Sequence, residues 1–90
     1  MVKISVKKIG EEPYEFEVVI KENGSSSTHT VEMKKGFHKN LNTDTNPEGV
    51  VKKSFEFLLE REPKESILRS FDIEMISNYF PNYSQKVKEF

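Results

Sequence analysis

Few residues in this sequence are able to do chemistry, because it holds two histidines and no cysteine. A serine nucleophile needs a neighbouring base and a further group that orients the base. Ser27 and His29 are close in the sequence, but hairpin residues two apart are not expected to present that geometry by spacing alone. We therefore interpret the serines at 25–27 as polar hairpin residues, and a small enzyme that uses His29 is only a minor alternative.

A metal or cofactor site is not indicated by the residue pattern either. His29 and His38 are nine residues apart and lack the i, i+4 spacing of a helical metal pair. The 4 glycines never cluster into a phosphate-binding loop. We predict no catalytic residue, no metal ligand and no cofactor, with His29 at a cross-strand or surface position and His38 in solvent.

Length and charge narrow the class of protein. A chain of 90 residues is expected to form one domain (1–90) with one modest core. Its 14 basic and 15 acidic residues are interspersed and give a formal net charge of −1, so no overall field attracts nucleic acid or an anionic membrane. No apolar run is long enough to span a bilayer, and the start of the chain does not resemble a signal peptide. We predict a cytoplasmic protein with no membrane partner and no specific nucleic-acid partner.

Residues 1–35 alternate between apolar and polar side chains, which is typical of half-buried strands. The apolar positions of the three predicted strands are Val2, Ile4 and Val6, then Tyr14, Phe16, Val18 and Ile20, then His29, Val31 and Met33. Asn23 and Gly24 favour a tight hairpin turn, which the serines at 25–27 are expected to lengthen or loosen. The pattern predicts a three-stranded antiparallel meander with one apolar face to be covered.

Residues 36–90 have the spacing of helices. We predict a short helix and loop over 36–45 and a long helix over 46–62, capped by Asn46, begun by Pro47 and ended before Pro63. Residues 63–90 are predicted to form short helices, one of them capped by Asp72, that fold back across the long helix. Strands first and helices second indicate an α+β fold, with three to four short-to-medium helices packed on one sheet face.

One stretch of the chain resembles a known group of proteins. Residues 54–63 (SFEFLLEREP), 66–73 (SILRSFDI) and 79–81 (YFP), with Ile76 between them and the strand 27–31, are similar to a family of small uncharacterised prokaryotic proteins. The resemblance runs from about Tyr14 to Tyr83. It implies kinship but no activity, because that family carries none.

A second, weaker analogy leads to a different function. A strand, a short helix and a longer helix follow one another over 28–62, as in ribbon-helix-helix DNA-binding dimers of the antitoxin type. Residues 37–44 are short and rich in asparagine for the first of those helices, and a preceding strand would compete for the edge that the dimer needs. This reading therefore stays an alternative that rests on analogy alone.

Large apolar side chains are concentrated in the C-terminal half, in excess of what a short meander can cover. We predict that the protein is a small non-catalytic interaction or regulatory module, binding another protein or a second copy of itself. Phe57, Tyr79 and Phe80 are the candidates for an exposed interaction surface. The alternative is that all three complete the core.

Overall fold

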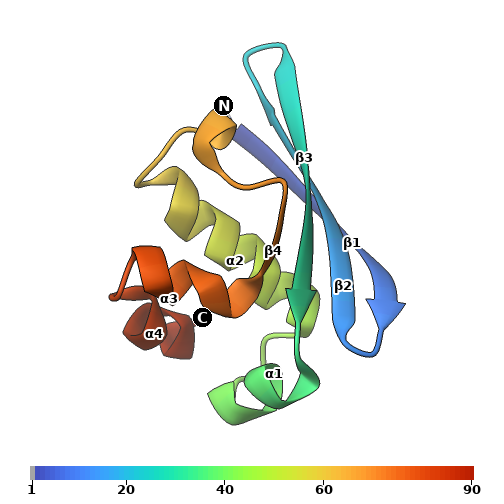
Figure 1. Cartoon of the computed structure of the whole chain (residues 1–90), viewed down its shortest axis with the longest axis vertical. Helices are drawn as coiled ribbons and strands as arrows, with labels where there is room; N and C mark the ends of the chain where they lie inside the picture. The colour runs from blue at the N-terminus through green and yellow to red at the C-terminus, as the bar shows by residue number, and fades with distance from the viewer. Residues whose placement is uncertain (1) are drawn as a thin grey trace.

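The alternating N-terminal segment forms three antiparallel strands in the computed structural model, which describes residues 2–90. They are β1 (Val2–Glu11), β2 (Tyr14–Glu22) and β3 (Ser25–Met33). Ile4 lies opposite Ile20, and Val18 lies opposite His29, so the apolar positions share one face as the alternation predicts. The predicted meander is confirmed (Figure 1).

The hairpin between β2 and β3 is tighter than expected. Asn23 and Gly24 have φ angles of 53° and 81°, the positive values that a two-residue turn requires. Glu22 pairs directly with Ser25, so the serines at 25–27 belong to β3 and do not lengthen the turn. The expectation of a loosened hairpin was wrong, because the turn chemistry is complete within the two central residues.

A fourth strand, β4 (Ser70–Asp72), pairs in parallel with β3 and completes a sheet of order β1-β2-β3-β4. The sequence predicted a helix here. Pro63 is extended, only a short 3₁₀ turn, η1 (Lys64–Ser66), follows it, and the chain then runs extended to reach β3. The amide of Thr30 donates to the carbonyl of Arg69 at 2.7 Å, so pairing with β3 replaces the helix. Local spacing does not reveal a strand whose partner lies 40 residues away.

Two of the helical elements begin where a capping residue predicts. After α1 (Lys35–Leu41), Asn46 accepts a hydrogen bond from the amide of Gly49 and begins α2 (Pro47–Leu59). α2 ends at Leu59 and not at 62, because the Arg61 amide bonds to the Leu58 carbonyl, three residues back, and the Phe57 carbonyl accepts from the Arg61 side chain. The short elements that follow are η2 (Ile73–Met75), capped by Asp72 as predicted, α3 (Ile76–Tyr79), α4 (Tyr83–Lys86) and η3 (Val87–Glu89).

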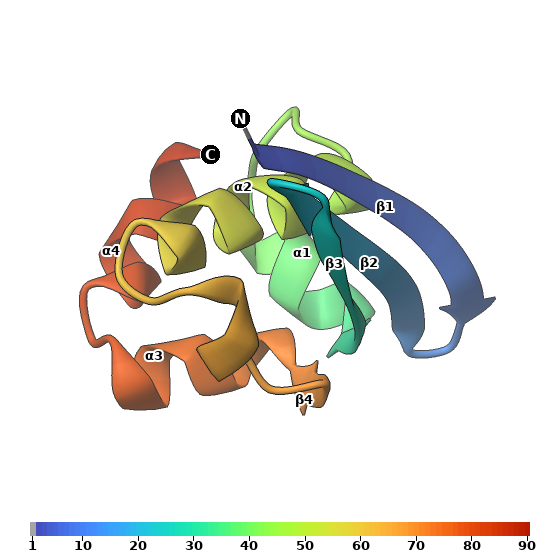
Figure 2. The same cartoon turned by 90° about the horizontal axis from the view of Figure 1, so that it is seen from above.

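The helices cover one face of the sheet, which confirms the predicted α+β architecture (Figure 2). Phe16, Val18 and Ile20 of β2 are fully buried beneath them, whereas Glu17 and Lys21 on the opposite face are exposed. α2 packs against the sheet through an apolar side that includes Val51 and Phe55. One hydrophobic core therefore lies between a sheet and a helical layer, and the C-terminal segments pack within the same chain.

Candidate functional site

An apolar groove opens between the C-terminal end of α2, the segment that leads into β4, and α3. Its buried wall consists of Leu58, Ile67 and Ile76, and its half-buried or exposed wall of Leu68, Phe71, Met75, Tyr79 and Phe80. The groove has a volume of about 300 Å³. Ligand-binding clefts in proteins start at roughly this size and are lined in the same way, by apolar walls with few polar groups.

Two side chains on the rim of the apolar groove are unusually exposed for their type. Leu68 is 48% exposed and Tyr79 is 63% exposed. The chain alternates across this rim, since Ile67 points into the core while its neighbour Leu68 points outward. Exposed large apolar residues beside an apolar hollow form a continuous patch, and such patches mark binding surfaces.

The only polar residues that line the apolar groove within the described chain are Glu62 and Ser66. Glu62 follows the end of α2 and is half-buried. Its neighbour Arg61 is turned away: the guanidinium carbon lies 3.6 Å from the centre of the Phe57 ring, and Nη1 donates to the Phe57 carbonyl. Arg61 also pairs with Glu60 at 3.2 Å. Glu62 is therefore the only charged residue on the groove wall within residues 2–90.

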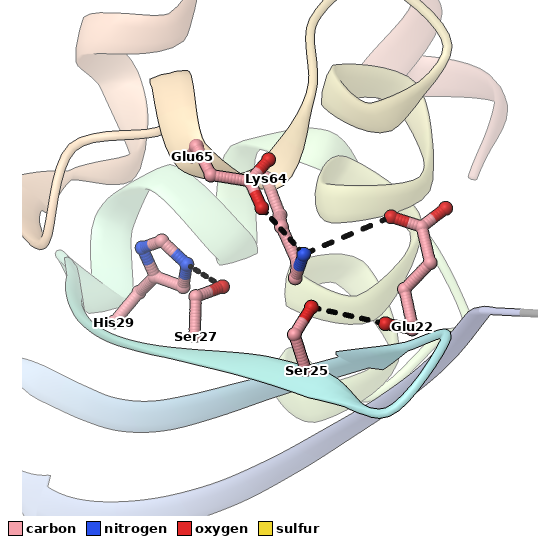
Figure 3. A network of polar contacts seen from close by, with 6 residues as sticks. All are labelled: Glu22, Ser25, Ser27, His29, Lys64 and Glu65. Atoms are coloured by element: carbon pink, nitrogen blue, oxygen red, sulfur yellow. Dashed lines mark hydrogen bonds and ion pairs between the residues drawn. The ribbon is translucent and has the colours of Figure 1, made fainter.

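A buried histidine holds the rim of the groove in place. His29 is 1% exposed, and its Nδ1 lies 2.8 Å from the carbonyl oxygen of Leu68. A carbonyl only accepts, so Nδ1 carries a proton, and Nε2 lies at hydrogen-bond distance, 2.8 Å, from the Ser27 hydroxyl. Figure 3 shows both side chains on the inner face of β3. The histidine thus has both ring nitrogens satisfied and joins β3 to the groove.

The sequence spacing was not expected to bring Ser27 to His29, but the two side chains are in contact. Residues two apart on a strand point to the same face, so the strand itself brings the hydroxyl to the imidazole. The Ser27 hydroxyl, the His29 ring and the Leu68 carbonyl follow one another in the order of a nucleophile, a base and a group that orients the base. The ring is almost fully buried, however, and neither Ser27 nor His29 lines the apolar groove. We interpret the contact as a structural one.

A buried lysine anchors η1 to the hairpin. The side chain of Lys64 is 5% exposed, and its Nζ lies 2.6 Å from Glu65 and 4.0 Å from Glu22 (Figure 3). The hydrogen bond from Lys64 lowers the pKa of the Glu65 carboxyl. Lys64 therefore neutralises the two acids nearest to it, and the segment between α2 and β4 is fixed at both of its ends.

The three residues predicted for an interaction surface have different environments. Phe57 is 5% exposed, covered by Arg61 and by the rings of Phe80 and Tyr83, whose centroids lie 6.2 and 5.3 Å away. It belongs to the core, which is the alternative considered for it. Phe80 is half-buried and Tyr79 is largely exposed, and both line the apolar groove. The sequence did not point to Glu62 or Met75 as groove residues, because their proximity to Tyr79 depends on the path of β4.

Two further polar groups have structural partners. His38 was expected in solvent, but it is half-buried, and its Nε2 donates to the Thr45 carbonyl at 2.8 Å. Ser54 and Tyr83 form a buried pair 2.6 Å apart that joins α2 to α4. Over residues 2–90, no three His, Cys, Asp or Glu side chains group in a way that could hold a metal ion. No described helix combines the length and apolar character needed to cross a bilayer.

Comparison of the chain with protein-family models, with curated proteins and with solved structures finds no match.

Proposed function

We propose that this chain is a small cytoplasmic module that acts by binding a segment of a partner protein in its apolar groove. The observation that carries the proposal is the exposure of Leu68 and Tyr79, at 48% and 63%, on the rim of a hollow with apolar walls. Both side chains line the hollow and are at the same time largely open to solvent, so part of their apolar surface is left uncovered. A macromolecule covers such a rim, whereas a small ligand fills only the hollow.

The ribbon-helix-helix alternative conflicts with the pairing of β3. A dimer of that type pairs one strand from each of two chains, so the strand before the helices needs a free edge. β3 has β2 on one side and β4 on the other, and residues 30–32 are paired on both sides. The interspersed charges of the sheet also provide no basic surface for phosphates.

The experiment is a selection of random ten-residue peptides by mRNA display on the immobilised full chain. Bound peptides are then measured by fluorescence polarisation against wild type and against the double variant Leu68→Ser, Tyr79→Ser. We expect at least a tenfold loss of affinity in the double variant, because truncation of central apolar contacts typically costs more than about 1 kcal/mol each.

A matched control variant carries Val2→Ser and Ile9→Ser. These residues are 39% and 52% exposed, lie on β1 and do not line the groove. The control should bind the selected peptides as wild type does. Peptides that lose affinity equally in both double variants, or in neither, would show that the groove is not the binding surface.

A further inference from the structure

We propose that the apolar groove selects a partner segment in which a large apolar side chain stands beside a lysine or an arginine, with Glu62 pairing with that cation. This inference rests on the proposed function and adds the chemistry of the partner to it. It follows from the charge on the groove wall, where the only acidic residue, Glu62, has no ion-pair partner within residues 2–90.

The acids around the groove differ in whether the chain already neutralises them. Glu60 pairs with Arg61, and Glu65 pairs with Lys64. Glu62 makes no ion pair with any other residue of 2–90, and no lysine or arginine lines the groove. Glu62 is therefore an unpaired acid on a groove wall that has no cation of its own.

The position of Glu62 at the end of α2 adds to the negative potential. The last carbonyls of a helix carry partial negative charge, and cations are favourable there while anions are not. The last turn of α2 contains no basic residue, and the one cation that bonds to it, Arg61, is held against Phe57. An acid at this place does not stabilise the helix, so helix stability does not explain it, whereas recognition of a cation does.

The apolar walls determine what must accompany the cation. A cation alone would be drawn to Glu62 but would leave Leu68 and Tyr79 uncovered. A segment with an apolar side chain next to a lysine or arginine covers both, and the apolar contact excludes water from the charge pair. Exclusion of water lowers the local dielectric constant and strengthens that pair.

The test is a double-mutant cycle between peptide and protein. The probes are the display-selected ten-residue peptides and copies in which their lysines or arginines are replaced by glutamine. Each peptide is titrated against wild type and Glu62→Gln. The matched control is Glu56→Gln, the same change at an exposed position of α2 that does not line the groove. Thermal unfolding of both variants checks that the fold is retained.

The expected result is a basic residue beside an apolar one in the selected peptides, and a coupling of about threefold to tenfold between that residue and Glu62, with none to Glu56. The coupling should decrease with added salt. Peptides that depend on Leu68 and Tyr79 but show no coupling to Glu62 would overturn this inference and leave the proposed function intact. Peptides that depend on neither rim residue would overturn both.

Discussion

His29 and Leu68 are 39 residues apart in the sequence, and a hydrogen bond of 2.8 Å from the histidine Nδ1 to the leucine carbonyl joins them. One residue further on, the Thr30 amide donates to the Arg69 carbonyl at 2.7 Å. These two bonds attach the rim of the apolar groove to the central strand of the sheet. The exposed side chain of Leu68 therefore stands on a rigid support.

Replacement of His29 tests this attachment. His29→Leu keeps a buried side chain of similar size but leaves the Leu68 carbonyl without its donor, so we expect a loss of about 1–3 kcal/mol in the free energy of unfolding. His38→Leu removes a hydrogen bond of the same length at a half-buried site, where water can replace it, and should cost less than about 1 kcal/mol. Urea unfolding measures both, and equal losses would contradict the role assigned to His29.

The buried pair of Ser54 and Tyr83 predicts an unequal effect of two similar deletions. The Ser54 hydroxyl donates to the Val50 carbonyl at 2.7 Å, so Tyr83 is the donor in the pair. Ser54→Ala leaves a buried phenol unsatisfied and should cost about 1–3 kcal/mol, whereas Tyr83→Phe leaves Ser54 bonded and should cost about 0.5–1.5 kcal/mol. Chemical denaturation that finds the phenylalanine variant the less stable of the two would refute this donor assignment.

Tyr83 also predicts how stability depends on pH. Burial raises the pKa of Tyr83 well above 10.0, its ordinary value. The unfolded chain therefore loses this proton near pH 10 while the folded chain keeps it, and stability falls as pH rises from 10 toward the folded pKa. The loss attributable to Tyr83 should reach about 1 kcal/mol at pH 11.

The control for the pH experiment is the comparison of two phenylalanine variants. Tyr83→Phe should lack this part of the decline, and Tyr79→Phe, changed at a 63% exposed position, should retain it. The measurement is the unfolding midpoint in urea at several pH values from 8 to 11. A Tyr83→Phe protein that loses stability as steeply as wild type would exclude this linkage.

Two leucines ten residues apart in the sequence test the division between core and groove rim. Leu58 is 4% exposed, and Leu58→Ala should cost roughly 2–5 kcal/mol. Leu68 is 48% exposed, and Leu68→Ala should change stability by less than about 1 kcal/mol. Thermal unfolding of the two variants gives the comparison. Similar losses would mean that Leu68 belongs to the core and is not available to a partner.

The parts of the fold that local chemistry determines could be predicted from the sequence. Alternation fixed the inward face of the three antiparallel strands, and Asn46 and Asp72 marked helix starts because a cap depends only on neighbouring residues. β4 could not be found in this way. It has three residues, and its extended form depends on hydrogen bonds to β3 that form only when the chain folds.

The groove was hidden for the same reason. A helix through 64–70 would turn Leu68 inward with Ile67, whereas the extended path to β4 buries Ile67 and exposes Leu68. Tyr79 and Phe80 were predicted as surface candidates because the C-terminal half holds more large apolar side chains than a short sheet can cover. Both residues line the groove. The Ser27–His29 contact, by contrast, was available from the sequence, because the side chains of a predicted strand alternate between its two faces.

The most direct test of the account is the location of a bound peptide by solution NMR. The full chain, labelled with ¹³C and ¹⁵N, is mixed with an unlabelled peptide from the display selection, and intermolecular nuclear Overhauser contacts are recorded. We predict contacts from the peptide to the Leu68 methyl groups, to Met75 and to the Tyr79 ring. Contacts confined to the open face of the sheet around Val19, or contacts between two copies of the chain in place of contacts to the peptide, would contradict it.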